Sequence, residues 1–309
     1  MFGAMKVERG YRSKDVEDGR GETATKGGGG GGRALKVGGG GALVVVIALI
    51  AQAFGVDLGI GGGGGGAPTT AGPQQPAGPG QATGQPPKAL PPGTTDPDAE
   101  MVDLVNQVTD DIQKVFAEQF KAEGMEYRRA KLRLFRAGIA TGCGFSESQI
   151  GPFYCPPDDK AYIDLSFYDD LREQLGAPGD FAAAYVIAHE FGHHVQNVLG
   201  VDQDVADKVA RNKKLANSLS VRQELQADCF AGVWAAHADK RLQIDTSDIQ
   251  EAMTAAAAIG DDRLQKSAGR AVDPRSFTHG SSAQRVKWFK IGQQQGVLGA
   301  CDTFTPKEP

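Results

Sequence analysis

Two histidines in the segment 188–194 stand four residues apart, and a glutamate directly follows the first of them. On an α-helix, His189 and His193 would lie one turn apart on one face, so their imidazoles can bind one Zn²⁺ ion through ring nitrogens. Glu190 would lie about 100° further round, where a general base can take a proton from water on the metal. So short a motif also arises by chance, but the apolar, helical approach over 181–188 favours the metal site. The motif therefore predicts the chemistry of a metallopeptidase.

A catalytic zinc ion needs a third protein ligand, and an acidic pair further along the chain offers one. Glu224 and Asp228 are four residues apart in a helical pattern over 221–234, so both lie on one face. This Glu-x-x-x-Asp helix after a His-Glu-x-x-His helix resembles the arrangement of thermolysin-like zinc peptidases. There the glutamate is the third ligand and the aspartate hydrogen-bonds a ligand histidine. The alternative is a solvated acidic face, which the apolar neighbours of both residues argue against.

The segments that precede these motifs differ sharply in composition from the globular sequence over 96–309. Residues 1–36 are charged and glycine-rich, which predicts disorder. Residues 37–56 carry no formal charge and are long enough for a transmembrane helix, with a signal-peptide core or a buried helix as alternatives. Residues 57–95 are rich in Gly, Pro, Gln and Thr and predict a flexible linker.

The distribution of basic residues predicts an orientation in the membrane. Eight Lys and Arg side chains precede 37–56, and none follows it before Lys88. By the positive-inside rule, the N-terminus stays in the cytoplasm and the domain over 96–309 lies on the other side of a single-pass anchor. The net charge of -5 and the lack of basic–aromatic clusters give no sign of nucleic-acid binding.

The globular sequence alternates between helical and strand-like patterns, which predicts an α+β fold. The expected elements are an amphipathic helix over 98–116, strands over 131–135 and 160–167, a polar insertion over 201–220, and helices over 248–259 and after a cap at Ser281 or Ser282. The strand over 160–167 comes shortly before the zinc helix. It is a candidate edge for pairing with an extended substrate, an ordinary edge strand being the alternative.

All four cysteines follow the predicted span, which suits disulfides in an exported domain. Cys143 and Cys155 flank a short loop and are expected to pair, which leaves Cys229 to pair with Cys301. Metal ligation by cysteine is the alternative, but no Cys-x-x-Cys spacing supports it.

Two later side chains are candidates for the active site. His279 precedes the cap of the last helix, where it could hydrogen-bond the oxyanion of a tetrahedral intermediate. Arg285 could hold a substrate carboxylate or carbonyl. Equally, His279 could be a loop residue and Arg285 a partner in a structural ion pair. His194 stands at i+5 from His189, off the ligand face, and is expected to support the site or lie at the surface.

Several longer motifs together carry a resemblance to the neutral zinc metallopeptidase family of bacteria. They are Val16–Asp18, a glycine-flanked span, Gly151–Pro156, His189–Gln196, Glu224–Trp234 and Thr278–Arg285. The resemblance implies that His189, His193 and Glu224 bind zinc, that Glu190 is the base and that Asp228 orients a ligand. The chain also resembles, more distantly, the CAAX-type membrane endopeptidases, which share a later His…Arg element. That likeness favours His279 and Arg285 as substrate contacts. This chain has Gly280 where those proteins have proline, so the loop geometry stays open.

The expected protein is thus a predominantly helical, zincin-like metallopeptidase domain with a small sheet, anchored by one transmembrane helix to the cytoplasmic membrane. Zn²⁺ is the expected cofactor, and a peptide or protein is the expected substrate. A non-catalytic, zinc-stabilised binding module of the envelope is the main alternative. A zinc hydrolase that acts on a non-peptide amide is a further one.

Overall fold

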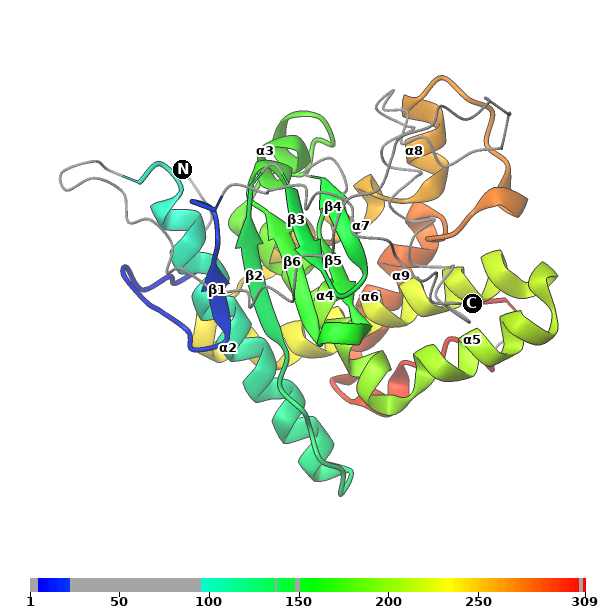
Figure 1. The fold of residues 1–309 in the computed structure, drawn as a ribbon, viewed down its shortest axis with the longest axis horizontal. Helices are drawn as coiled ribbons and strands as arrows, with labels where there is room; N and C mark the ends of the chain where they lie inside the picture. The colour runs from blue at the N-terminus through cyan, green and yellow to red at the C-terminus, as the bar shows by residue number, and fades with distance from the viewer. Residues whose placement is uncertain (1–4, 23–95, 137, 148–150, 306–307) are drawn as a thin grey trace, which may run out of the picture.

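The structure is a computed structural model that describes residues 5–22, 96–136, 138–147, 151–305 and 308–309 (Figure 1). The predicted span over 37–56 and the linker over 57–95 lie outside these residues. Among the helices that the structure describes, none is long and apolar enough to cross a membrane.

A four-stranded sheet lies at the centre, with the strand order β1-β2-β6-β5. The strands are β1 (Val16–Asp18), β2 (Lys131–Phe135), β5 (Phe153–Cys155) and β6 (Lys160–Asp164). β1 and β6 both run parallel to β2, and β5 runs antiparallel to β6. A separate hairpin pairs β3 (Gly138–Thr141) with β4 (Gly144–Glu147). The two strands predicted from alternation are therefore both present, although β6 ends at Asp164 because α3 begins at Ser166.

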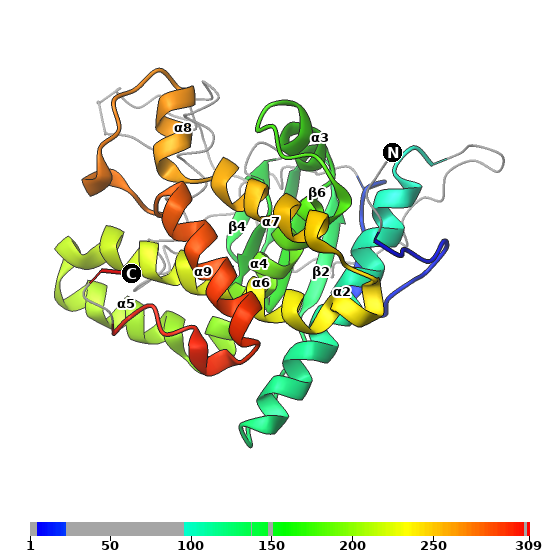
Figure 2. The ribbon, with the colours of Figure 1, turned by 180° about the vertical axis from the view of Figure 1, so that it is seen from behind.

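Eight helices are described, and most of them pack on one side of the sheet, as Figures 1 and 2 show from opposite directions. They are α2 (Ala99–Ala122), α3 (Ser166–Glu173), α4 (Asp180–Leu199), α5 (Val201–Arg211), α6 (Ala216–Leu242), α7 (Thr246–Ala258), α8 (Asp261–Ser267) and α9 (Ser282–Gln295). The apolar stripe of α2, with Val105, Val108 and Ile112 buried, closes the core against α4 and α6. The predicted helices over 98–116 and 248–259 correspond to α2 and α7, and Ser281 caps α9.

The N-terminal segment folds against the domain, so the prediction of disorder over 1–36 is wrong for residues 5–22. Met5 is buried, the Lys6 amide donates to the Leu242 carbonyl, and β1 forms the edge of the sheet. Arg20 forms ion pairs with Asp96 and Asp98. The charged composition suggested disorder, but here the charges form ion pairs at the rim while three residues complete the sheet. The domain therefore includes residues 5–22 as well as the part that begins near Asp96.

Strand pairing also sets a condition on membrane topology. Because β1 and β2 exchange backbone hydrogen bonds, both strands lie on the same side of any membrane. A single crossing between residues 22 and 96 would separate them. The predicted single-pass arrangement and this sheet therefore exclude each other in one folded chain.

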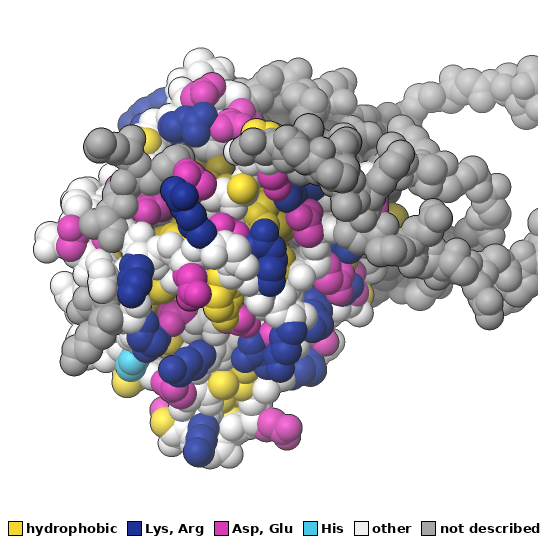
Figure 3. Space-filling model, turned by 90° about the vertical axis from the view of Figure 1, so that its left-hand side faces the viewer, with side chains coloured by type: hydrophobic (Ala, Val, Ile, Leu, Met, Phe, Trp, Pro, Cys, Tyr) yellow, Lys and Arg dark blue, Asp and Glu magenta, His cyan; other side chains and the backbone are white. Residues whose placement is uncertain are grey.

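The face formed by the N-terminal segment, β1 and α2 mixes charges of both signs (Figure 3). Lys and Arg side chains alternate there with Asp and Glu, and many are paired: Arg12 with Asp103, Arg129 with Asp15, and Arg20 with Asp18. In each of these pairs one partner is largely buried and the other is partly exposed, so the pairs lie at the rim of the domain. They show how the charged N-terminal sequence is accommodated on a folded surface.

Both predicted disulfides are present, Cys143–Cys155 and Cys229–Cys301. The first joins the β3–β4 hairpin to β5. The second ties the C-terminal tail to α6, the helix that carries Glu224. No described cysteine is free, so cysteine ligation of a metal has no support among the described residues.

Two glycines let the helices around the site pack backbone to backbone. A Cβ at Gly192 on α4 would lie 2.9 Å from the Ala227 Cα on α6. A Cβ at Gly292 on α9 would overlap the carbonyl oxygen of Cys229 on α6. Ordinary side chains would separate these helices, so the glycines decide how closely the residues on α4, α6 and α9 approach.

Candidate metal centre

Three buried side chains from two helices converge on one point. His189 and His193 come from α4 and Glu224 from the neighbouring α6, and each has one ligand atom within 4.8 Å of the others. His189 Nε2 lies 3.2 Å from one carboxylate oxygen of Glu224, and His193 Nε2 lies 3.6 Å from the other. Two imidazole nitrogens and one carboxylate are the donor set of catalytic zinc sites such as that of thermolysin. The structure thus brings together the three ligands expected from the sequence.

The outer nitrogens of both histidines are held by acceptors, which leaves Nε2 free to bind a metal. His189 Nδ1 lies 2.9 Å from Asp228 Oδ1, and His193 Nδ1 lies 2.9 Å from Gln196 Oε1. Each acceptor favours the tautomer with hydrogen on Nδ1 and a lone pair on Nε2. The amide of Gln196 is in turn fixed, because its Nε2 donates to the Gln223 carbonyl. Sequence reasoning missed Gln196, although its i+3 spacing from His193 is the signal that could have found it.

Asp228 is the centre of a buried polar network. Its Oδ1 accepts hydrogen bonds from the Tyr185 hydroxyl at 2.5 Å and from Arg285 Nη2 at 2.8 Å, besides facing His189. Its Oδ2 accepts from Arg285 Nε at 2.8 Å. Burial alone would raise the pKa of Asp228, but Arg285 and His189 lower it to about 2. The carboxylate is therefore ionised and able to orient His189.

Arg285 lines the cavity over the site, but its guanidinium is engaged in an ion pair. It is 1% exposed, and its guanidinium forms a bidentate pair with Asp228. Further contacts reach the Tyr185 hydroxyl and the Ile259 carbonyl, each at 3.3 Å. The ion-pair alternative left open by the sequence is the one that the structure shows. Arg285 holds the aspartate that holds a metal ligand, so its effect on the metal is indirect.

His279 does face the site, and a residue that sequence reasoning missed holds it there. His279 Nδ1 lies 3.0 Å from Asp261 Oδ1, and Asp261 Oδ2 accepts the backbone N–H groups of Thr278, His279 and Gly280. His279 Nε2 is buried and has no hydrogen-bond partner. Because Asp261 fixes one side of the ring, the other nitrogen is presented to the cavity. Nothing in the sequence pattern around Asp261 predicted this role.

Glu190 lies beside the ligands without being one of them. It is 7% exposed, and within the described residues no hydrogen bond holds its carboxylate. Burial raises the pKa of Glu190, while His193 and His189 act in the opposite direction. A carboxylate of raised pKa is a stronger base, as general-base chemistry requires.

A cavity of about 60 Å³ opens over these groups. Glu190, His279 and the three expected ligands line it, together with residues 152–154 from the start of β5. The prediction placed the substrate edge at the strand over 160–167, but β6 lies inside the sheet between β2 and β5. The edge strand beside the site is β5.

His194 belongs to the support of the fold rather than to the ligand set. It is fully buried, its Nδ1 lies 2.9 Å from the Tyr154 hydroxyl, and its Nε2 contacts the Arg128 carbonyl. It therefore ties α4 to β5 from the side of the helix opposite the metal ligands. The expectation of a supporting role holds, and the surface alternative does not.

An α+β domain with a His-Glu-x-x-His helix and a glutamate from the next long helix defines the class of zincin-like metal centres. Comparison with known proteins gives the particular family. The chain belongs to the family described as "Putative neutral zinc metallopeptidase", whose model matches residues 5–304. The match includes the N-terminal segment that completes the sheet.

Two bacterial relatives support the same assignment. The chain is 49% identical over 208 residues to the uncharacterized protein YpfJ of Escherichia coli K12, which covers 67% of this chain and 71% of that protein. It is 47% identical over 190 residues to the uncharacterized protein Rv2575 of Mycobacterium tuberculosis, which covers 58% of this chain and 64% of that protein. No solved structure matches the chain.

Proposed function

We propose that this protein is a zinc-dependent endopeptidase that hydrolyses peptide bonds with Glu190 as the general base. The observation that carries the proposal is the convergence of His189 Nε2, His193 Nε2 and the Glu224 carboxylate beside a carboxylate that binds none of them. A purely structural zinc site is closed by four protein ligands, whereas this set of three leaves a position open for water or substrate. The family assignment supports the same metal.

The residues present fit a zinc ion, since both ligand imidazoles have Nδ1 engaged and Nε2 directed toward Glu224. Zinc bound by this set supplies Lewis acidity, which makes a water nucleophilic near neutral pH and polarises a carbonyl. Glu190 takes the proton from that water and later gives it to the leaving amine. Asp228, Gln196 and Arg285 hold the ligands in place throughout.

Two further features support a peptide as the substrate. Among the described residues, β5 pairs with β6 alone and so forms the edge of the sheet, and it lies next to the cavity. An extended peptide can add to such an edge through its backbone. His279 Nε2 is buried and unpartnered and lines the same cavity; with hydrogen on both ring nitrogens, His279 would donate from Nε2 to the carbonyl oxygen as negative charge develops on it.

We also propose that the domain works outside the cytoplasm, as the two disulfides favour an oxidising compartment. In that case residues 5–22 are exported with the remainder of the domain, since β1 and β2 share a sheet. A single crossing through residues 37–56 is not part of this proposal, because it would place β1 and β2 on opposite sides of the membrane.

Glu190→Gln tests the proposal. This variant should bind zinc and melt as the wild type does, yet cut no protein when both are compared in a proteomic cleavage screen on isolated membranes. Glu173→Gln, an exposed glutamate on α3, is the matched control and should cleave normally. If the wild type and both variants give the same cleavage products, the protein is not a peptidase, and the zinc-stabilised binding module becomes the better explanation. Cleavage of non-peptide amides alone would indicate the third alternative.

A further inference from the structure

A second cluster of acidic side chains lies at the N-terminal end of α4, away from the zinc ligands. Asp180 begins α4, and Asp248 and Glu251 come from α7. Each offers one carboxylate oxygen, and these three oxygens lie within 4.8 Å of one another. α7 is thus brought against the start of the helix that carries the zinc site.

Two oxygens of this cluster are buried without a partner. Asp180 is 6% exposed and Asp248 is fully buried, yet Asp180 Oδ1 and Asp248 Oδ1 have no hydrogen bond. The second oxygen of Asp248 accepts the Asp245 amide in a capping box, and Glu251 Oε2 accepts the Phe181 amide. Buried polar atoms left unpaired cost free energy, so native structures normally supply a partner, an ordered water or an ion.

The cluster also lacks a positively charged partner in the part of the chain that the structure describes. Within the described residues, no Lys or Arg forms an ion pair with Asp180, Asp248 or Glu251. Burial raises the pKa of all three carboxyls, and repulsion among them raises those of Asp180 and Glu251 further. Gly179, with φ +120°, has no side chain, and a Cβ there would overlap the Glu251 carboxylate. The backbone is therefore shaped to let this third carboxylate approach.

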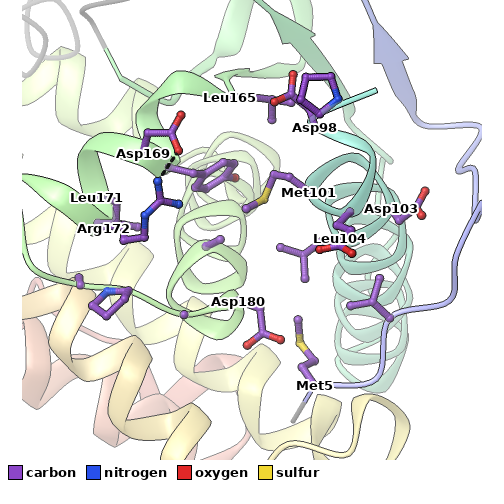
Figure 4. A pocket seen from close by; sticks show the side chains of 18 of the residues that line it. Met5, Asp98, Met101, Asp103, Leu104, Leu165, Asp169, Leu171, Arg172 and Asp180 are labelled. Atoms are coloured by element: carbon purple, nitrogen blue, oxygen red, sulfur yellow. Dashed lines mark hydrogen bonds and ion pairs between the residues drawn. The ribbon is translucent and has the colours of Figure 1, made fainter. Parts of the chain in front are cut away.

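Of the three carboxylates, Asp180 lies at the wall of a cavity of about 340 Å³ (Figure 4). The cavity lies between the N-terminal segment, the start of α2, α3 and the start of α4, and Asp180 forms part of its wall. The cluster therefore lies behind the wall of this cavity, with Asp180 between the cavity and α7.

We infer that Asp180, Asp248 and Glu251 form a structural calcium site that joins α4 to α7. Calcium takes oxygen ligands at 2.3–2.6 Å in a flexible geometry, and the three carboxylate oxygens lie within 4.8 Å of one another, close enough to share one such ion. The smaller magnesium ion holds its ligands at 2.0–2.1 Å and needs a tighter, octahedral set. The set contains no imidazole or thiolate, which zinc and softer metals favour. The ion would fix the first turn of α4 and so steady the helix that presents His189.

The zinc-loaded full chain, exchanged into calcium-free buffer, tests this inference. Isothermal titration with CaCl₂ should show one site per chain. Calcium at about one hundred times its dissociation constant should raise the melting temperature by about 5 to 10 °C. Asp180→Asn should weaken calcium binding by about ten-fold or more, because binding strength follows the number of charged ligands. Asp273→Asn, which changes an exposed carboxylate elsewhere, should bind calcium as the wild type does.

Direct calcium titration of the wild type keeps the test decisive if Asp180→Asn folds poorly, and Glu251→Gln provides a second variant. The inference would be overturned if titration of the wild type with CaCl₂ gave no heat of binding and calcium did not raise its melting temperature. Equal calcium binding by the wild type and both cluster variants would place any ion elsewhere and would overturn it too. Tighter binding of magnesium, or of a second equivalent of zinc, would show that the site is not a calcium site. Peptidase activity enters none of these outcomes.

Discussion

Replacement of Asp228 by asparagine should destabilise the protein and weaken zinc binding together. Asparagine keeps the shape of the side chain but removes the negative charge that faces Arg285 and His189 at 2.8 and 2.9 Å. The fully buried guanidinium would then lose its counter-ion. Breaking a buried ion pair in this way costs about 3–5 kcal/mol.

The pKa of Asp228 gives an independent magnitude. Its reduction from 3.8 to about 2 corresponds to roughly 2 to 3 kcal/mol of preference for the ionised form in the folded protein. Both routes predict a loss of about 3 kcal/mol in the free energy of unfolding. Since Asp228 also fixes His189, zinc affinity should fall by about 10- to 100-fold.

Urea denaturation of the zinc-free protein measures the first quantity, and competition with a chromophoric chelator measures the second. The folded pKa of Asp228 is depressed, so its contribution is fully present above pH 4 and is lost as the pH falls toward 2. The difference in the free energy of unfolding between the wild type and Asp228→Asn should therefore become smaller as the pH falls from 4 toward 2. Asp273→Asn removes the partner of the exposed Arg275 and is the matched control, for which no measurable change is expected.

The reasoning fails if the free energy of unfolding of Asp228→Asn lies within about 1 kcal/mol of the wild-type value. It fails equally if the variant binds zinc with unchanged affinity. Either result would mean that the hydrogen bonds around Asp228 do not carry the energy that their burial implies.

Three further changes test how the elements are assembled. Gly192→Ala should cost about 1–3 kcal/mol of stability, because the added methyl meets the backbone of α6. Gly299→Ala, where a Cβ meets no atom within 4 Å, should not, and equal stability of the two variants would refute the close-packing argument. Loss of the disulfide between α6 and the C-terminal tail, which spans 72 residues, should lower the free energy of unfolding by about 4 kcal/mol, as urea titration of the paired Cys→Ser variant would show. On intact cells, an impermeant thiol reagent should label Glu8→Cys and Met125→Cys alike, whereas protection of the first alone would mean that β1 does not join the sheet in the cell.

The chemistry of the site could be predicted from the sequence because it is written in local spacing. A helix places residues i and i+4 on one face. The spacing alone therefore identifies His189 with His193, and Glu224 with Asp228, as candidate site residues. Apolar periodicity likewise gave α2 and α7, alternation gave β2, and the spacing of the cysteines suggested both disulfides.

The contacts between site residues that lie far apart in the chain were determined only by the tertiary structure. Arg285 meets Asp228 across 57 residues because glycines let α6 and α9 pack closely, and no local pattern encodes that crossing. Asp261 likewise reaches His279 only once the loop before α9 has folded over α8.

The N-terminal strand shows the same limit in the backbone. Residues 16–18 are too few and too charged to predict a strand, since their stability comes from hydrogen bonds to β2 more than a hundred positions away. The three carboxylates at the start of α4 are a further case, because α4 and α7 are adjacent in space but not in sequence. The sequence by itself thus determined which residues could do the chemistry. Only the packing of the helices and the sheet determined which residues hold them in place.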